Sequence, residues 1–467
     1  MPSRPSVVGL LLGVGCASAA TAQVRSATLV AIQGGPAAGS TISTVNTPFV
    51  DNAGSVGFVA SLADARRAIM RSTGGPAGVA WESSLGLPTA LTGGESTMGI
   101  SAASGFIYSP SADGRDAVYT QAGLLLAADD PAPGVPGRFI TFCSRPRMTG
   151  SGTAVWVSGT AATQGGASSA RVFYQNVDPS NPSLTTPLLA SGDTFAPGLT
   201  VSASGIGFDY DISENGRRIH ELLATGAPAA SDECIWADGV LIAREGSPAP
   251  DGTNWGPFSG VAINNNGDTL FTADTTGPTN ADQVLVLNGA IILREGDVVD
   301  GRTLGSAVSA LAIDNHRNIV VTWTTPAETL YFRQPDGTTT ALLAVGETID
   351  TDGDGAADYT VTDFNASAVI GPGLDLADTG PVYLHVDLQP IGGGADLQAV
   401  IGVARPGGSA CRPDYNGDGV LDPDDLADFI ACYFSLPPCA QANYNSDAAV
   451  DPDDLADYIA DYFAGCV

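Results

Sequence analysis

Oxygen-bearing side chains recur at a fixed spacing in residues 414–425 (DYNGDGVLDPDD). They fall at positions 1, 3, 5, 9 and 12 of a loop whose position 6 is glycine, where the chain must turn sharply. Carboxylates this close together repel one another unless a cation lies between them. The spacing therefore predicts a site that surrounds one Ca²⁺ with about six or seven oxygens. The candidate ligands are Asp414, Asn416, Asp418, Val420 (through its carbonyl), Asp422 and Asp425.

The same pattern returns 29 residues later, in residues 443–454 (NYNSDAAVDPDD). This copy begins with Asn443 and has Ala448 where the first copy has its turn glycine. It thus carries one carboxylate fewer and a strained turn, and we expect it to bind Ca²⁺ more weakly. Its candidate ligands are Asn443, Asn445, Asp447, Ala449 (through its carbonyl), Asp451 and Asp454.

A third candidate loop lies in residues 350–358 (DTDGDGAAD). Position 12 would be Val361, so the closing carboxylate must come from elsewhere, and Asp363 is one candidate. The alternative interpretation is a solvated Asp-Gly hairpin tip without a cation. The candidate ligands are Asp350, Asp352, Asp354 and Asp358.

No catalytic residue is predicted. We interpret His220, His316 and His385 as structural, because they fall in an apolar repeat position, a turn and a strand. The sequence has no serine-hydrolase elbow, zinc-peptidase motif or phosphate-binding loop. A glycosidase needs two facing carboxylates, and the sequence singles out no such pair.

Helices and disulfides are expected to support the paired loops. Proline follows each loop's ninth position, where it suits the first turn of a helix. Apolar residues at helical spacing then predict two amphipathic helices. Their apolar positions are Leu426, Phe429, Ile430 and Tyr433, and likewise Leu455, Tyr458, Ile459 and Tyr462.

Four cysteines crowd into residues 411–467, which favours disulfides over a zinc site. We favour the pairs 432–439 and 411–466, although four cysteines allow other connectivities. Cys143 and Cys234 either join distant parts of the central region or are two buried thiols.

Residues 411–467 resemble a dockerin, the duplicated half-EF-hand module, and specifically the GC-type module that closes bacterial exported proteins; the chain ends in Gly465-Cys466-Val467. The resemblance implies that the ligand positions above bind Ca²⁺ and that the module attaches the protein to a partner. Cohesin-binding dockerins use loop positions 10 and 11, which here are Pro423-Asp424 and Pro452-Asp453 rather than small hydroxylated residues. The implied partner is therefore a cohesin-like protein or another anchor at the cell surface.

Charge and composition divide the chain into four parts. Arg4, the apolar run at 7–14 and the small residues at 20–22 predict a signal peptide (residues 1–22), so we expect a secreted or cell-surface protein without a membrane span in the mature chain. A β-repeat domain (23–404), a linker (405–410, RPGGSA) and the dockerin-like domain (411–467) follow. The net charge of −31 disfavours nucleic acid and anionic membranes as partners.

A degenerate N-x-x-G-x-x-x-hydrophobic motif recurs through the β-repeat domain, about every 54 residues. Its markers are Gly54, Gly152, Gly216 and Gly267, with further candidates at Gly114, Arg317 (replacing glycine) and Gly380. The domain is similar to secreted proteins with tandem N-x-x-G-x-x-x-F units, a family without an established activity.

Short β-branched and aromatic runs between Gly, Asn and Asp turns predict a mainly β fold; Leu62–Met70 is the main segment with helical periodicity. Repeated units of this length favour a β-propeller of about six or seven blades beside a small all-α calcium-binding domain. Two stacked β-sandwiches are the alternative.

These features predict an exported Ca²⁺-binding protein whose dockerin-like module anchors a non-enzymatic binding or scaffold domain. The alternative is a secreted carbohydrate-active enzyme, tethered for polysaccharide degradation, and inward-facing carboxylates at the propeller centre would favour it.

Overall fold

The computed structural model describes most of the chain. The described residues are 24–51, 54–73, 75–82, 91–101, 105–112, 115–325, 327–365, 373–378, 380–406, 415, 423–435, 439, 442–444 and 450–464. The predicted signal peptide lies outside them.

The strands are grouped in successive sheets. The first sheet contains β2 (Pro36–Ala37), β3 (Ser40–Val45), β4 (Phe49–Val50), β5 (Val56–Leu62), β6 (Arg67–Ser72) and β7 (Gly78–Glu82). The second contains β8 (Leu91–Ser101), β9 (Gly105–Ala112), β10 (Arg115–Thr120) and β11 (Gly123–Ala127). The third contains β12 (Phe139–Met148), β13 (Ala154–Ala161), β14 (Ala170–Asn176) and β15 (Thr185–Ala190).

The remaining strands continue this order. The fourth sheet contains β16 (Thr194–Ala196), β17 (Leu199–Ile212), β18 (Arg218–Ala224), β19 (Glu233–Ala237) and β20 (Val240–Arg244). The fifth contains β21 (Trp255–Ile263), β22 (Thr269–Thr275), β23 (Val284–Leu287) and β24 (Ala290–Arg294); the hairpin β25 (Val298–Val299) and β26 (Arg302–Thr303) follows. The sixth contains β27 (Val308–Ile313), β28 (Ile319–Thr325), β29 (Ala327–Arg333) and β30 (Thr339–Ala344). The last contains β31 (Thr348–Asp350), β32 (Tyr359–Phe364), β33 (Leu374–Leu376), β34 (Val382–Pro390), β35 (Leu397–Val403) and β1 (Arg25–Ile32).

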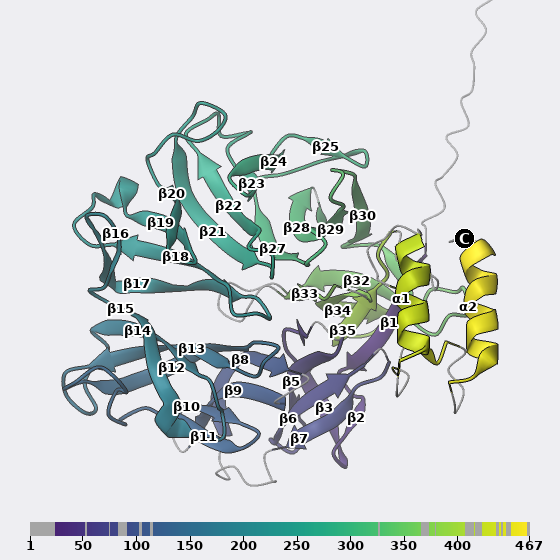
Figure 1. The fold of residues 1–467 in the computed structure, drawn as a ribbon, viewed down its shortest axis with the longest axis horizontal. Helices are drawn as coiled ribbons and strands as arrows, with labels where there is room; N and C mark the ends of the chain where they lie inside the picture. The colour runs from purple at the N-terminus through teal and green to yellow at the C-terminus, as the bar shows by residue number, and fades with distance from the viewer. Residues whose placement is uncertain are drawn as a thin grey trace, which may run out of the picture.

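These sheets form a β-propeller. Among the described residues, seven sheets have four or more strands, and Figure 1 shows them arranged around a central axis. The innermost strands contact one another in chain order, and β33 contacts β4, which closes the ring. The predicted mainly β fold, with a propeller of six or seven blades, is confirmed, and the alternative of two stacked sandwiches is wrong.

The last sheet joins the two ends of the propeller. β1 pairs with β35 in antiparallel register, with Ala27 opposite Val403. The first strand of the domain thereby completes a sheet built from its last strands, so that the ring is closed by hydrogen bonds between distant parts of the chain. Such closure leaves few unpaired strand edges.

The N-x-x-G motif forms the turn between the first two strands of a blade. Its first residue in the fifth blade, Asn264, accepts backbone hydrogen bonds from Asn266 (3.1 Å) and Asp268 (2.9 Å). Its glycine, Gly267, has a φ of +83°, a conformation that favours glycine. Four other turns have the equivalent bond, in which the side chain of the first turn residue accepts from the backbone N–H of the residue four positions later. These acceptors are Asp51, Thr149, Ser213 and Asp314.

Two of the predicted repeat markers, Arg317 and Gly114, differ from the glycine markers above. Arg317, which replaces glycine in the sixth blade, still has a φ of +65°. Gly114 lies outside the described residues, and in the sequence it falls between β9 and β10. The segment with helical periodicity, Leu62–Met70, spans the end of β5, a turn and the start of β6.

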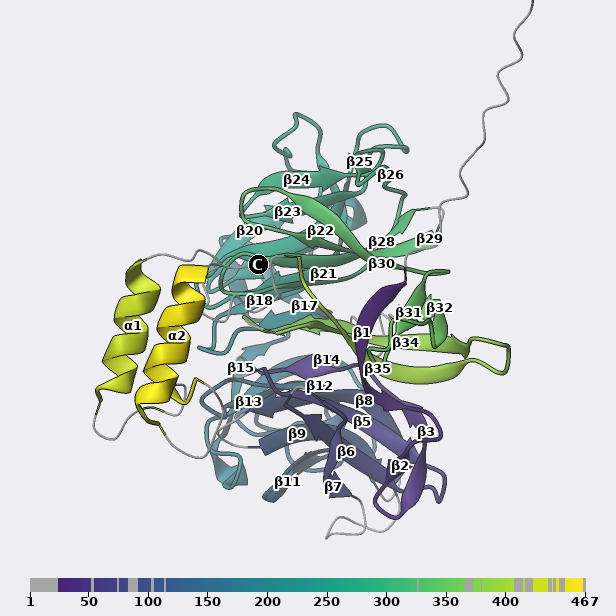
Figure 2. The same ribbon diagram turned by 90° about the vertical axis from the view of Figure 1, so that its right-hand side faces the viewer.

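Beyond the propeller, α1 (Pro423–Tyr433) and α2 (Pro452–Ala464) lie side by side in both views (Figures 1 and 2). Both helices begin at the proline that the sequence places in their first turn. Within the described residues, no helix has the length and apolar character needed to cross a membrane.

Candidate functional site

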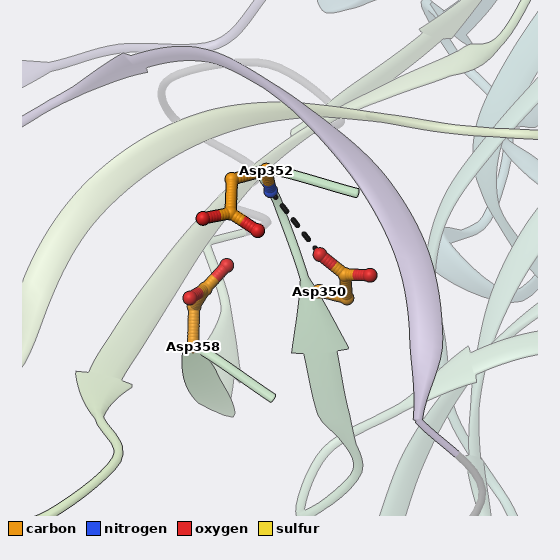
Figure 3. Close-up of side chains that lie close together, drawn as sticks. All are labelled: Asp350, Asp352 and Asp358. Atoms are coloured by element: carbon orange, nitrogen blue, oxygen red, sulfur yellow. Dashed lines mark hydrogen bonds between the residues drawn. The ribbon is translucent and has the colours of Figure 1, made fainter. Parts of the chain in front are cut away.

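The acidic loop at residues 350–358 joins β31 to β32. Ile349 pairs with Tyr359 at the end of this ladder. Asp350 follows Ile349 and Asp358 precedes Tyr359, so both lie at the base of the loop. The loop between them places Asp352 close to both. Figure 3 shows the three carboxylates gathered together, and ligand oxygens of all three lie within 4.8 Å of one another.

Backbone donors hold Asp350 at the centre of the loop. Its carboxylate accepts hydrogen bonds from the backbone N–H of Gly353 (2.7 Å), Gly355 (2.8 Å) and Asp352 (3.2 Å). These bonds, led by that from Gly355, lower the pKa of Asp350, so the side chain is ionised at neutral pH. The loop can wrap in this way because Gly353 (φ +79°) and Gly355 (φ +86°) adopt left-handed conformations.

The other predicted ligands of this loop behave differently. Asp358 accepts bonds from the backbone N–H (2.8 Å) and the hydroxyl (2.7 Å) of Thr351. Asp354 lies outside the group of three and accepts a bond from the backbone N–H of Ala356. Asp363 does not close the loop: it lies on β32, where burial and the neighbouring Asp387 raise its pKa. Three convergent carboxylates could bind one Ca²⁺, with carbonyls or waters completing its six to eight oxygens.

The described residues of the two C-terminal sequence copies contribute to one shared core. Equivalent residues, 29 positions apart, meet at the centre: the rings of Phe429 and Tyr458 stack in parallel with centroids 3.9 Å apart. Both rings are buried, and Tyr415 and its equivalent Tyr444 each meet Tyr458 edge-on. Six of the eight predicted stripe residues belong to this shared core: Leu426, Phe429, Tyr433, Leu455, Tyr458 and Tyr462. The other two, Ile430 and Ile459, are exposed instead.

Only some of the predicted ligands of the paired loops belong to the described residues. Asp425 and its equivalent Asp454 are completely buried at the start of α1 and α2. Asp454 also caps its helix, accepting a 2.9 Å bond from the backbone N–H of Asp451. Asn443 is the first residue of the second predicted loop, which leads into α2. Outside the described residues lie Asp414, Asn416, Asp418, Val420, Asp422, Asn445, Asp447 and Ala449.

A disulfide joins Cys432 to Cys439, as predicted. The other expected pair, 411–466, lies outside the described residues. Cys143 and Cys234 are buried free thiols, which settles the two alternatives left open for them.

Seven residues occupy the same register position on the innermost strands. Each pairs across the first hairpin of its blade with the residue eight positions later, as Asp211 does with Ile219. We call these residues the axial ring. The ring consists of Phe49, Gly99, Arg147, Asp211, Ala262, Ala312 and Asp375.

The axial ring separates two cavities of about 190 and 90 Å³, and every ring residue lines at least one of them. Phe49, Arg147, Asp211 and Asp375 line both. This site was not predicted from the sequence, although a signal existed: in six blades the ring residue lies two positions before the first residue of the N-x-x-G turn, with Arg317 and Gly380 counted as markers.

Backbone N–H groups of neighbouring blades hold both ring carboxylates. Asp211 accepts a 2.9 Å bond from Ile263 on β21, and Asp375 a 2.8 Å bond from Val50 on β4. Burial raises the pKa of both side chains, that of Asp375 to about 7. The positive charge of Arg147 lowers both pKa values and so partly offsets the effect of burial. Its guanidinium carbon lies 4.1 Å from the centroid of the Phe49 ring.

A second charged group adjoins the larger cavity. Arg145 is buried and forms a 3.5 Å ion pair with Asp209. Asp209 also lies beside Glu221. The pKa of Glu221 is raised to about 8, mainly by burial and then by repulsion from Asp209 and Glu233.

The histidines lie away from these carboxylates. His220 is buried, with Phe173 edge-on at 4.7 Å and Tyr210 stacked at 5.6 Å. Burial lowers the pKa of His220 to about 3 and that of His385 to about 4. Both therefore remain neutral at physiological pH and pack as core residues.

Several known structures show a likeness to this chain at low identity. A protein of unknown function from Bacteroides caccae is 15% identical over 60% of this chain and 89% of its own, with a TM-score of 0.32. A puromycin-hydrolysing peptidase of Mycobacterium tuberculosis is 10% identical over 80% of this chain and 56% of its own (TM-score 0.41). The Dos1 propeller is 8% identical over 62% and 66% (TM-score 0.30). Likeness at this level carries no functional argument.

No curated protein matches this sequence. The model of a family described as "Family of unknown function (DUF7453)" matches residues 28–302, more than half of the chain and most of the propeller. The chain therefore belongs to DUF7453, a family of unknown function.

Proposed function

We propose that this chain is an exported Ca²⁺-binding protein whose dockerin-like C-terminal unit anchors or sorts a non-enzymatic β-propeller, acting as a binding or scaffold domain, at the cell surface. One observation carries the proposal: Asp425 and Asp454 are completely buried at equivalent positions of the duplicated unit. A buried carboxylate is costly unless it is compensated, and bound Ca²⁺ supplies that compensation at the predicted loop position.

The loop at residues 350–358 supports Ca²⁺ binding by the propeller as well. Its three carboxylates converge although like charges repel, and backbone donors keep Asp350 ionised. In this proposal Ca²⁺ joins the end of β31 to the start of β32 and stabilises the hairpin on the last blade.

An anchoring role is supported by apolar side chains on the outside of the C-terminal unit. Phe434 and its equivalent Phe463 are 68% and 78% exposed. Ile430 and Ile459, also equivalent, are 38% and 37% exposed. A unit of this size gains from covering such side chains, so a cohesin-like or other surface protein is the proposed partner.

Chelation of Ca²⁺ tests the proposal in the full chain with its disulfide reduced. All five tryptophans precede residue 405, so their fluorescence reports on the propeller alone. Far-ultraviolet circular dichroism at helical wavelengths reports on α1 and α2. We expect a chelator to abolish the helical signal while the tryptophan melting transition remains, and added Ca²⁺ to restore it. A helical signal insensitive to the chelator would contradict the proposal.

A secreted polysaccharide hydrolase is the second candidate, and one observation favours it: Asp209, Asp211 and Asp375 line the axial cavity. Screening the full chain against soluble polysaccharides tests this candidate. Release of reducing sugar that is lost in Asp211→Asn and Asp375→Asn would support it.

A further inference from the structure

The larger of the two cavities at the axial ring, called the axial cavity here, has no role in the proposed Ca²⁺-dependent anchoring. Its volume of about 190 Å³ is large enough for several water molecules. The space exists because two ring positions, Ala262 and Ala312, carry only a methyl group. A small molecule fits a cavity of this volume.

The charges around the cavity do not balance. Arg145 and Asp209 form an ion pair with each other. In the axial ring, one guanidinium (Arg147) and two carboxylates (Asp211 and Asp375) line the cavity, so one negative charge is left over when both carboxylates are ionised. Each carboxylate accepts only part of the hydrogen bonds it can accept, because a carboxylate has about four acceptor sites.

The remaining walls are apolar or carry hydroxyl groups. Val261, Leu311 and Leu374 line the cavity from three successive blades, and the hydroxyls of Ser259 and Thr272 lie 3.0 Å from one another at its side. A bare metal ion gains nothing from the apolar walls. A short hydrocarbon that bears an ammonium group matches both the walls and the surplus carboxylate.

We propose that the axial cavity binds a small alkylammonium ion, with its charged group against Asp211 and Asp375 and its hydrocarbon against the apolar walls. The blade-to-blade bonds from Ile263 and Val50 hold the two carboxylates in place for this contact. The site is thereby assembled only when the propeller is closed.

Ionisation of Asp375 makes the binding depend on pH. Arg147 of β12 and Asp211 of β17 are the charged groups that act on Asp375, and the backbone N–H groups of Val50 and Leu376 donate to it. With a pKa of about 7, Asp375 is mostly protonated at pH 6 and mostly ionised at pH 8. An alkylammonium ion keeps its charge throughout, so its affinity should rise about tenfold from pH 6 to pH 8.

Isothermal titration of the full chain with n-butylammonium chloride tests the proposal, with 1-butanol as the neutral isostere. We expect one site per chain for the ammonium ion, at least tenfold weaker binding in Asp375→Asn, and blocked binding in Ala312→Val, which reduces the cavity. The exposed Asp178→Asn is the matched control and should bind as the wild type does.

Folding of each variant is checked by its tryptophan melting transition. Should Asp375→Asn fail to fold, Ala312→Val and the pH dependence still decide the matter. Equal binding of 1-butanol, wild-type binding by Ala312→Val, displacement of the amine by millimolar Ca²⁺, or polysaccharide hydrolysis that depends on Asp211 would overturn the proposal.

Discussion

Asp314 and Arg405 form a buried ion pair between two blades. The Arg405 guanidinium donates a 3.0 Å hydrogen bond to the Asp314 carboxylate, and the two side chains are only 8% and 0% exposed. Asp314 is the first residue of the turn between β27 and β28. Arg405 follows β35 and also donates to the backbone carbonyls of Asp378 (3.0 Å) and Gly380 (2.6 Å). The end of the propeller chain is thereby attached to the turns of the last two blades.

Replacing Arg405 by alanine should destabilise the propeller strongly. Burial already raises the pKa of Asp314 despite its donors, and removal of the guanidinium would leave this carboxylate without its counter-charge. Breaking a buried pair in this way costs about 3–5 kcal/mol. The tryptophan-detected urea midpoint measures the effect. The control is Arg115→Ala, whose partner Asp130 is 40% exposed, and it should cost about 1 kcal/mol or less.

That pair could not be predicted from the sequence. The Pro/Gly-rich composition of residues 405–410 indicates a flexible linker, yet Arg405 is fixed by a partner 91 positions earlier in the chain. The N-x-x-G turns were predictable because their acceptor and their left-handed residue lie within one short motif.

The axial ring and the surroundings of Asp363 were also not predictable, because they depend on residues that lie far apart in the sequence. Ring residues from different blades meet only once the propeller has closed, so the gathering of Arg147, Asp211 and Asp375 around one cavity has no local signature. Asp363 lies two residues beyond the closing position of the loop, and on β32 it pairs with Asp387. In Leu62–Met70, helical periodicity arose because a turn interrupts the alternation of two strands.

The calcium loop of the propeller can be tested with two substitutions in the same segment. Asp350→Asn removes a charge from the convergent group, whereas Asp354 lies outside that group. We expect millimolar Ca²⁺ to raise the melting temperature of the wild-type propeller, because a ligand stabilises the state that binds it. Asp350→Asn should weaken the apparent Ca²⁺ affinity at least tenfold, and Asp354→Asn should change it less than twofold. An equal loss of Ca²⁺ affinity in both variants would mean that Asp354 is also a ligand, as the sequence spacing predicts. It would contradict the observed group of three carboxylates.

Asp375 should make the propeller less stable as the pH rises. Its pKa is raised to about 7 in the folded state, so between about pH 4 and pH 7 the folded chain binds a proton that the unfolded chain has released. The stability from this group is complete below about pH 4 and is lost as the pH approaches 7, at most about 4 kcal/mol for a shift of about three pH units. Asp375→Asn should flatten this part of the profile, as followed by urea midpoints between pH 4 and pH 8. Glu221→Gln is the comparison, since its pKa of about 8 places its own loss at higher pH.

The stacked pair Phe429 and Tyr458 should decide whether the C-terminal unit folds. Phe429 is buried among the aromatic rings of both sequence copies, and its replacement by alanine costs about 3–5 kcal/mol in a typical core. A unit of this size has little stability to lose, so Phe429→Ala should abolish the helical circular dichroism even with Ca²⁺ present. Phe434→Ala is the matched control, because that ring is 68% exposed, and it should change the stability by less than about 0.5 kcal/mol. Retention of the helical signal in Phe429→Ala would mean that Ca²⁺ and the disulfide suffice to hold the two helices without their shared aromatic core.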